Sequence, residues 1–298
     1  MRFGLLGTGH WAAEVHAAAL AADTAVEFVG VWGRNSSRAA TLAERYGSRP
    51  YADPDELLAE VDAVSFALPP DVQADLAQRF GAAGKHLLLD KPLALSVAAA
   101  DAVVSAAEHG GAASVVFFTS RFDRAVADWL GAARAQTWHG ARVTWLGSLL
   151  DEGNPYAESP WRQVKGGLWD LGPHALAVAI PLLGPVSAVT AAVEAGDRTT
   201  HAVLEHERGG WTTLATSLAV PPAAATFELS AYGPTGWTTM PSMTDGPVTA
   251  YREALRQLLG VVGAGRTDHP CDVRFARDIV HVLADVETLI GGSATRRA

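Results

Sequence analysis

The first twenty residues decide the fold, and they read Met1-Arg-Phe-Gly-Leu-Leu-Gly-Thr-Gly-His-Trp-Ala-Ala-Glu-Val-His-Ala-Ala-Ala-Leu20. The apolar run before Gly7 predicts a buried strand, and the residues from Ala12 onward predict a helix. Between them, Gly7 permits a tight turn, Gly9 lets the backbone approach a pyrophosphate, and the small Ala12 lets the helix lie close to the strand. The helix N-terminus would offer free N–H groups to phosphate. Taken alone, a motif of this kind is as often an ordinary glycine turn as a nucleotide-binding turn. The elements around it therefore decide between the two.

Strand and helix patterns alternate over residues 1–119. Further strands are expected at 25–32, 62–68, 86–89 and 113–118, with helices at 36–46, 71–83 and 96–108 between them. This alternation is typical of a parallel, doubly wound α/β sheet. We therefore predict an NAD(P)-binding Rossmann domain over residues 1–119, and this context favours nucleotide binding over a plain turn.

Residues 120–298 follow a different pattern. Strands are expected at 141–149, 186–193, 202–207, 211–218 and 227–232, with helices at 122–133, from Gly166-Gly167 onward and at the end of the chain. Gly209-Gly210 marks a hairpin. We predict an α+β domain over 120–298 for substrate binding and oligomerisation, with an open, mainly antiparallel sheet. One face of such a sheet needs cover, and our hypothesis is a homodimer or homotetramer through that open face.

Composition excludes several classes of function. The 298 residues carry 23 basic and 32 acidic side chains, a net charge of −9, so nucleic acid and anionic membranes are not expected partners. The longest apolar stretch, near residues 175–183, is too short to span a bilayer. Cys271 is the only cysteine, so no internal disulfide can form, no metal site is expected, and a cytoplasmic location is predicted.

The end of the second expected strand bears on cofactor choice. A dinucleotide fold usually carries Asp or Glu there to bind the ribose 2′-hydroxyl. Here the place holds Gly33, followed by Arg34, Asn35, Ser36, Ser37 and Arg38. A guanidinium and hydroxyl groups suit a 2′-phosphate, which favours NADP(H), with NAD as the alternative. The alternative is that these residues are only a solvated helix start, where Arg34 does not bind the cofactor.

Two further stretches contain groups suited to proton chemistry. Lys91 follows the expected strand 86–89 and would lie at the sheet edge where ligands bind, although a single strand-end lysine is usually only solvated. Asp170 and His174 are four residues apart and would share a helix face. Histidine is the usual general acid or base near neutral pH. Taken alone, such a pair is more often a surface pair, and a zinc site would need a third ligand that does not stand out.

Together these motifs resemble the Gfo/Idh/MocA oxidoreductases, the family of glucose-fructose oxidoreductase and inositol dehydrogenase. The resemblance covers nearly the whole chain and is carried by Gly7-Thr-Gly-His-Trp-Ala12 with Glu14-Val-His16, by Gly84-Lys-His-Leu-Leu-Leu-Asp-Lys-Pro92, and by Trp161-Arg162 with Gly166-Gly167 and Asp170-Leu-Gly-Pro-His174. The chain departs from the family pattern in three places: Asp90 replaces the commoner Glu, Leu68-Pro69-Pro70 replaces Thr-Pro-Asn, and Gln73 replaces His.

The resemblance implies reversible hydride transfer between a nicotinamide and a secondary alcohol of a sugar, cyclitol or related small molecule. It makes Lys91, Asp170 and His174 the catalytic residues. The cofactor would be bound by Gly7, Thr8, Gly9, His10, Trp11, Gly33, Arg34, Asn35, Ser36, Arg38, Leu68, Pro69, Pro70, Asp90 and Lys91. The substrate would meet Arg121, Trp161, Arg162 and Trp169, although a tryptophan is more often core and Arg121 could instead reach an internal carboxylate. Two alternatives stay open: a non-catalytic NAD(P)-binding regulatory or assembly protein, and an NAD-dependent hydrolase or lyase without net redox change.

Overall fold

The computed structural model describes residues 1–151 and 153–295, which fold into two compact units. The first unit comprises Met1–Asp123 and Asp245–Arg277, and the second comprises Arg124–Thr244 and the chain from Asp278 onward. The sequence-based division at residue 119 cuts the chain once. In the structure the helix α9 (Pro247–Gly263) packs on the strands and first helix of the first unit, so a late segment of the chain completes the early one.

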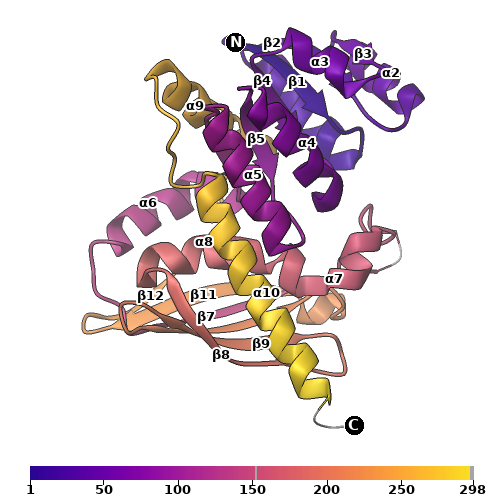
Figure 1. The fold of residues 1–298 in the computed structure, drawn as a ribbon. Helices are drawn as coiled ribbons and strands as arrows, with labels where there is room; N and C mark the ends of the chain where they lie inside the picture. Colours follow the sequence, from indigo (N-terminus) through magenta and orange to yellow (C-terminus); the bar gives the residue numbers. More distant parts are fainter. Residues whose placement is uncertain (152, 296–298) are drawn as a thin grey trace. The chain divides into compact units, whose positions relative to one another are not determined.

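The first unit is built on a six-stranded sheet in which every pair of neighbouring strands is parallel (Figure 1). The strand order is β3-β2-β1-β4-β5-β6, the doubly wound arrangement predicted from the sequence. The strands are β1 (Arg2–Leu6), β2 (Glu27–Trp32), β3 (Arg49–Tyr51), β4 (Ala63–Phe66), β5 (His86–Asp90) and β6 (Ser114–Phe117). The order reverses between β1 and β4. In such sheets ligands bind at the carboxyl ends of the strands beside this reversal.

Helices connect the strands of the first unit: η1 (Ala12–Ala17), α1 (Ala18–Ala22), α2 (Ser36–Arg45), α3 (Pro54–Glu60), α4 (Pro70–Ala82) and α5 (Val97–His109). The short η2 (Thr119–Phe122) follows the last strand. Two details differ from the sequence-based expectation. The first helix opens with a π-helical segment, η1, before it becomes α-helical. The helix expected at 36–46 ends at Arg45, and it is capped by Asn35, whose side chain accepts a hydrogen bond from the Arg38 N–H at 3.0 Å.

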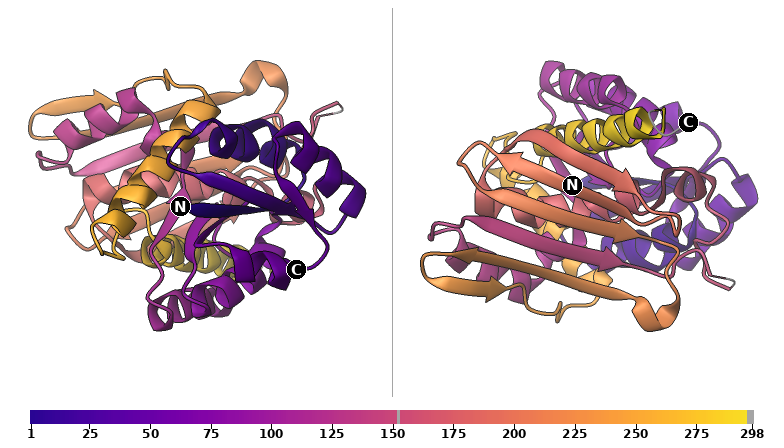
Figure 2. Two further views of the ribbon diagram at one scale, coloured as in Figure 1. Left: turned by 90° about the horizontal axis from the view of Figure 1, so that it is seen from above. Right: turned by 90° about the horizontal axis from the view of Figure 1, so that it is seen from below.

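The second unit contains a six-stranded sheet of order β12-β11-β7-β10-β9-β8. Its strands are β7 (Gly140–Leu146), β8 (Val186–Glu194), β9 (Thr200–His206), β10 (Trp211–Ser217), β11 (Thr226–Gly233) and β12 (Gly236–Thr239). The pairs are antiparallel except β7 with β10, which is parallel. The predicted hairpin at Gly209-Gly210 joins β9 to β10. Figure 2 (right) shows these strands with no described helix in front of them.

The other face of the second sheet is covered by helices, with α8 packed against β7 and β10. The helical segments of this unit are α6 (Arg124–Ala133), α7 (Pro160–Asp170), α8 (Gly172–Leu183), the short η3 (Pro222–Ala224) and most of α10 (Val273–Thr295). The sequence predicted one long helix beyond Gly166-Gly167, which is wrong. Gly166 has φ 62° and ψ −158° inside α7, and a new helix begins after Leu171. Pro173 has no N–H to continue the helical hydrogen bonds across this junction.

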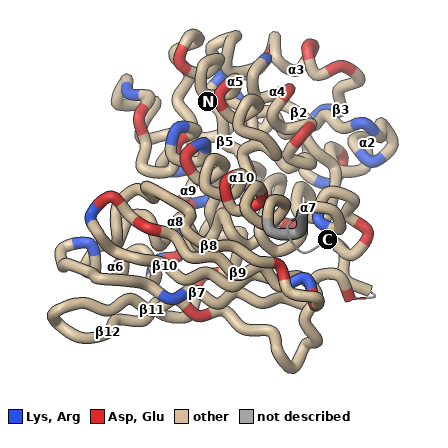
Figure 3. The backbone as a smooth tube through the Cα atoms, turned by 60° about the horizontal axis from the view of Figure 1, so that its bottom comes forward, with Lys and Arg blue, Asp and Glu red and all other residues tan. Residues whose placement is uncertain are grey.

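No helix of the described residues is long and apolar enough to cross a membrane. Figure 3 shows acidic and basic positions interspersed along the chain, with basic positions on α2. Cys271 is a buried free thiol, and burial raises its pKa to about 11. This thiol is therefore protonated near neutral pH and is a poor nucleophile.

Candidate cofactor and catalytic residues

The turn after β1 has the geometry that its two glycines predict. Gly7 has φ 132°, and its N–H donates to the Trp32 carbonyl at 2.8 Å. A Cβ on Gly7 would lie 2.2 Å from the Ala67 carbonyl oxygen, so only glycine fits. A Cβ on Gly9 would meet no atom within 4 Å. The backbone at Gly9 is therefore open to a ligand, beside the exposed His10 and the half-buried Trp11.

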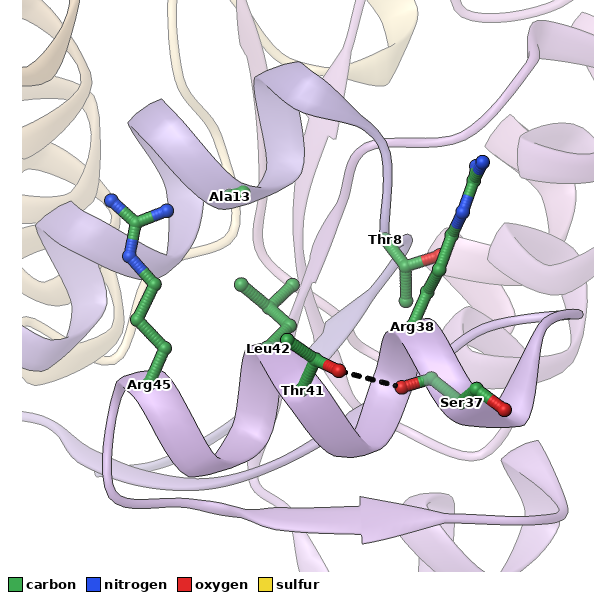
Figure 4. Close-up of a pocket in the computed structure, with 7 residues that line it drawn as sticks. All are labelled: Thr8, Ala13, Ser37, Arg38, Thr41, Leu42 and Arg45. Carbon is green, nitrogen blue, oxygen red and sulfur yellow. Dashed lines mark hydrogen bonds between the residues drawn. The ribbon is translucent and has the colours of Figure 1, made fainter.

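A cavity of about 380 Å³ lies between this turn and α2 (Figure 4). Of the residues named from the sequence, Thr8, Ser37 and Arg38 line it. The remaining lining residues are Ala13, Thr41, Leu42 and Arg45. In Figure 4 the Arg38 side chain extends beside Thr8, and Arg45 lies at the other end. Arg45 already forms an ion pair with Glu14, with one N–O distance of 2.6 Å.

Gly33 is required by close packing rather than by its backbone angles. A Cβ at this position would lie 2.5 Å from the Thr8 Cγ2 atom. An acidic side chain, the usual ribose ligand at this place, could not be built here unless Thr8 moved. Arg34 and Ser36 are exposed and do not line the cavity, and Asn35 is used as the helix cap. Ser37 and Arg38 are therefore the hydroxyl and guanidinium best placed for a phosphate.

The loop after β4 contacts the glycine turn. Ala67 supplies the carbonyl that excludes a side chain at Gly7, and its N–H donates to the Leu6 carbonyl at 2.8 Å. Leu68 and Pro69 are half-buried, and Pro70 begins α4. This proline-rich loop therefore borders the same edge of the sheet as the glycine turn.

The turn that carries Lys91 is fixed by one buried glutamine. The Gln73 Nε2 donates to the carbonyls of Asp90, Pro92 and Leu93 at 2.8, 3.1 and 3.3 Å, and its Oε1 accepts from the Asp90 N–H at 3.0 Å. Gln73 is 1% exposed. The Asp90 carboxylate accepts a further hydrogen bond from the Lys91 N–H at 2.7 Å, and the Lys91–Pro92 peptide is cis. Lys91 itself is partly exposed.

In the second unit, Asp170 is the last residue of α7 and is 2% exposed. Its Oδ2 atom lies 3.1 Å from the Arg162 Nε atom. The Arg162 guanidinium also lies over the rings of Tyr156 and Trp161, at 4.7 and 4.5 Å from their centroids. This contact orients the Asp170 carboxylate, because a guanidinium donor at hydrogen-bonding distance fixes the accepting oxygen.

His174 lies in the first turn of α8 and is 8% exposed. Its ring lies 5.2 Å from that of Trp145 on β7, and Trp145 stacks on Phe227 of β11 at 3.7 Å. Both aromatic rings are half-buried. Asp170 and His174 therefore belong to two helices joined at Leu171, not to one continuous helix as the sequence suggested.

The helix junction depends on close contact with the sheet. A Cβ on Gly167 would lie 2.6 Å from both the Cα and the N atoms of Ser217, at the end of β10. Glycine at this position lets the α7 backbone touch the strand directly. The pair Gly166-Gly167 therefore has two separate functions, a backbone angle at the first glycine and a close approach at the second.

The predicted substrate residues fall into different environments. Trp161 and Arg162 are half-buried at the start of α7, whereas Trp169 is 1% exposed and packs in the core of its unit. Arg121 belongs to the first unit, in η2, and its guanidinium lies 5.8 Å from the centroid of the Phe275 ring. Within residues 1–151 and 153–295, no group of three or more His, Cys, Asp or Glu could hold a metal ion.

Several residues were missed by reasoning from the sequence. Thr41, Leu42 and Arg45 share the face of α2 that carries Arg38, a spacing that the sequence does contain. The partners of Gln73 could not be read from the sequence, because they are backbone atoms far along the chain. The partners of His16 could not be read from the sequence either, because they are side chains of three other elements.

Comparison with known proteins extends this picture. Residues 1–118 match the sequence profile of the family described as "Oxidoreductase family, NAD-binding Rossmann fold" (GFO_IDH_MocA). A segment of 109 residues is 38% identical to UDP-N-acetylglucosamine 3-dehydrogenase of Acidithiobacillus ferrooxidans, covering 37% of this chain and 34% of that protein. A segment of 124 residues is 35% identical to inositol 2-dehydrogenase of Rhizobium meliloti, covering 41% and 37% of the two chains. These matches therefore span about a third of each curated relative.

Solved structures are similar over the whole chain. The structure of the Acidithiobacillus ferrooxidans enzyme superposes with a TM-score of 0.82, at 22% identity over 97% of both chains. An oxidoreductase from Agrobacterium radiobacter, solved in complex with NAD+, L-tartaric acid and magnesium, gives a TM-score of 0.80 at 16% identity over 98% of this chain and 97% of that one. At these identities the likeness concerns the fold.

Proposed function

Because its N-terminal 118 residues belong to the Gfo/Idh/MocA oxidoreductase family, which has an NAD-binding Rossmann fold, we propose that this protein is an NAD(P)-dependent dehydrogenase. The reaction is hydride transfer between the nicotinamide and a secondary alcohol or ketone of a sugar, cyclitol or related small molecule. The observation that carries the proposal is one sheet edge, where the glycine turn, the cavity beside α2 and the Lys91 turn follow β1, β2 and β5 of the same parallel sheet.

The residues present fit a dinucleotide, and they favour NADP(H). A side chain is excluded at Gly7, the backbone at Gly9 is open, and position 33 has no room for a carboxylate beside Thr8. Thr8, Ser37 and Arg38 would hold the 2′-phosphate, since hydroxyl and guanidinium donors make charge-assisted hydrogen bonds to phosphate oxygens. The bound nicotinamide would supply the hydride acceptor or donor.

Three side chains are proposed to act on the substrate. His174 would take the hydroxyl proton in the oxidative direction, because a neutral imidazole is a suitable base near pH 7. The Lys91 ammonium would stabilise negative charge on the substrate oxygen. Asp170, which the Arg162 contact orients, would hold a substrate hydroxyl or the imidazole.

The substrate class is proposed from the second unit and from the names of the relatives. The half-buried pair Trp145 and Phe227 lies beside His174, and an aromatic face of this kind suits the apolar face of a sugar or cyclitol ring. Trp161 and Arg162 at the start of α7 would add a hydrogen-bonding group. The two curated relatives are named for UDP-N-acetylglucosamine and for inositol.

We further propose that two or four copies of the chain associate through the open face of the second sheet. The residues that line a shallow cavity of about 500 Å³ on this sheet include Val203, Thr213 and Ala215. Light scattering on Ala215→Glu and on the wild type tests this. The proposal expects an oligomer that the added charge disrupts, and a wild-type monomer at micromolar concentration contradicts it. The predicted cytoplasmic location stays a prediction.

The test of the activity is a screen of sugars and polyols with NADP+ and NAD+, followed by absorbance at 340 nm. We expect turnover with at least one cyclic polyol or sugar, and a loss of at least a hundredfold in kcat for His174→Ala and Lys91→Met. Tight cofactor binding with no turnover would instead indicate a regulatory or assembly protein. Product formation from a bound, retained cofactor without absorbance change would indicate a hydrolase or lyase.

A further inference from the structure

A buried polar chain lies directly behind the Lys91 turn, and it joins four elements of the first unit. His16 in η1, Ser65 in β4 and Tyr251 in α9 are each 0% exposed. The His16 Nδ1 atom lies 2.8 Å from the Ser65 Oγ atom, which lies 2.7 Å from the Tyr251 hydroxyl. The other ring nitrogen of His16, Nε2, lies 4.0 Å from the Asp90 Oδ2 atom. Asp90 immediately precedes Lys91.

Two protonation states along this chain are fixed by burial. Burial raises the pKa of the Tyr251 hydroxyl above its usual range, and the Asp90 charge acts in the same direction. Burial lowers the pKa of His16 to about 3. At neutral pH the chain therefore consists of a phenol, a serine hydroxyl and a neutral imidazole. Each of these groups has one proton to donate along the chain.

The two directions of the hydrogen bonds differ in which proton is left outside the chain, and only one of them places that proton beside a negative charge. If the Tyr251 O–H donates to Ser65, the Ser65 O–H is free to donate to His16 Nδ1, and the imidazole proton must sit on Nε2. In the reverse direction His16 Nδ1–H donates to Ser65, and Ser65 donates to Tyr251. The phenolic proton would then lack an acceptor, and a lone pair on His16 would face the Asp90 carboxylate.

We propose that Tyr251, Ser65 and His16 form a hydrogen-bond chain of fixed direction that presents the Nε2–H of His16 to the Asp90 carboxylate. Within the described ranges, this nitrogen has no hydrogen-bond partner. At 4.0 Å the contact is longer than a hydrogen bond, so the attraction is between the N–H dipole and the carboxylate charge. The chain is a positioning device, because Asp90 in turn accepts from the Lys91 N–H at 2.7 Å.

This role complements the contacts of Gln73. Gln73 holds the backbone of the turn through the carbonyls of Asp90, Pro92 and Leu93, whereas His16 acts on the Asp90 side chain. The Tyr251 ring also packs edge-on against Phe117 at 4.9 Å and tilted against His16 at 4.2 Å. Only the kinetic part of the proposal rests on the proposed dehydrogenase function.

The direct test is the tautomer of His16, measured by long-range proton–nitrogen NMR at pH 7 on the full-length protein and assigned by comparison with His16→Gln. We expect the Nε2–H tautomer in the wild type. Tyr251→Phe removes the donor to Ser65, so the Nδ1–H tautomer should become populated. Ser65→Ala, on a different strand, should also release the preference and replaces Tyr251→Phe if that variant does not fold.

Tyr46→Phe is the matched control, because its hydroxyl donates to the Ala13 carbonyl in the same N-terminal segment but does not touch His16. That variant should keep the wild-type tautomer. A wild-type Nδ1–H tautomer, or an Nε2–H tautomer that survives both Tyr251→Phe and Ser65→Ala, overturns the proposed chain. These outcomes need neither cofactor nor substrate and are independent of the proposed activity.

The kinetic consequence separates positioning from simple folding support. With a polyol or sugar from the activity screen, Tyr251→Phe should lower kcat at least fivefold while the dissociation constant for NADPH stays within twofold of the wild type. Tyr46→Phe should not change kcat. A shifted tautomer with unchanged kcat would refute the positioning role and leave only the hydrogen-bond chain. If no compound in the screen is turned over, the dehydrogenase proposal fails and the tautomer experiment still decides the chain.

Discussion

The Lys91 turn of the first unit and the Asp170–Leu171 junction of the second each receive hydrogen bonds from a side chain outside the turn or junction, and the two side chains differ in charge. Gln73 is neutral and binds backbone carbonyls and one N–H. Arg162 is charged and binds the Asp170 carboxylate. If Gln73 is replaced, buried backbone groups lose a neutral hydrogen-bonding partner. If Arg162 is replaced, the buried Asp170 carboxylate loses a cationic partner. The two candidate catalytic positions should therefore respond differently to mutation and to pH.

The largest effect is expected where a buried charge would lose its partner. Arg162→Leu should lower the free energy of unfolding by about 3 kcal/mol or more, because it removes the guanidinium that lies 3.1 Å from the buried Asp170 carboxylate. Urea denaturation measures the loss. Arg142→Leu is the control, since its contact with Glu228 is exposed and should contribute no more than about 1 kcal/mol. Equal losses for the two variants would contradict the importance of burial at the Asp170 junction.

The next effect tests the backbone contact that supports the same junction. Gly167→Ala should destabilise the protein by about 2 kcal/mol, because the new Cβ would lie 2.6 Å from Ser217 backbone atoms. Gly131→Ala in α6 meets no atom within 4 Å and should be neutral or stabilising by up to about 1 kcal/mol. A thermal-unfolding midpoint for Gly167→Ala at or above that of the wild type would show that α7 does not need this contact.

The neutral support in the first unit should contribute less to stability than the charged one. Gln73→Leu should cost about 2 kcal/mol, since the Asp90 N–H and three carbonyls lose a buried partner. It should also lower kcat, because the Lys91 turn loses its backbone restraint. The control is Gln78→Leu, which removes one bond to the Ala74 carbonyl in the same helix. If Gln73→Leu cost as much as Arg162→Leu, the neutral-versus-charged distinction would fail.

Low pH should destabilise the first unit more than the second. This change in the free energy of unfolding is expected to be smaller than those of the preceding predictions. Burial lowers the pKa of His16 to about 3 and that of His269 to about 4, both in the first unit, and it lowers the pKa of His206 in the second. The unfolded histidines bind protons below about pH 6.5. Stability therefore falls as pH drops from there toward 4, by about 1 kcal/mol per pH unit for each of His16 and His269.

Hydrogen exchange at pH 7 and pH 5, corrected for intrinsic rates, measures this difference between the units. The variant His269→Gln should reduce the acid sensitivity of the first unit. His109→Gln, at an exposed helix end, should leave it unchanged. Faster loosening of the second unit at pH 5 would contradict the assignment of neutral histidines as supports of the first.

Much of the first unit could be predicted from the sequence, because its signals are local. Gly7, the strand–helix alternation and the position of Lys91 after a strand all depend on neighbouring residues, and the parallel sheet follows from them. The supports of the site could not be predicted, because Gln73 meets residues 17 to 20 positions away and Ser65 meets Tyr251 at a separation of 186. Such pairs are created only by the tertiary fold.

The second unit was harder to predict for a related reason. Its strands and the Gly209-Gly210 hairpin follow local patterns, but the parallel pairing of β7 with β10 joins distant segments. The continuous helix expected around Asp170 and His174 assumed ordinary helical spacing. The missing N–H of Pro173 interrupts the helical hydrogen bonds between Asp170 and His174 at Leu171, and the family motif gave these residues without this geometry.

The most direct test of the account is a titration of the wild-type protein with NADPH and with NADH, followed by tryptophan fluorescence. The account predicts that NADPH binds at least tenfold more tightly, a difference of about 1.4 kcal/mol. It also predicts that Arg38→Ala removes this preference and that Arg34→Ala, outside the cavity, largely keeps it. Equal or tighter binding of NADH, or an Arg38→Ala variant that weakens both cofactors alike, would contradict the assignment of Thr8, Ser37 and Arg38 to the 2′-phosphate.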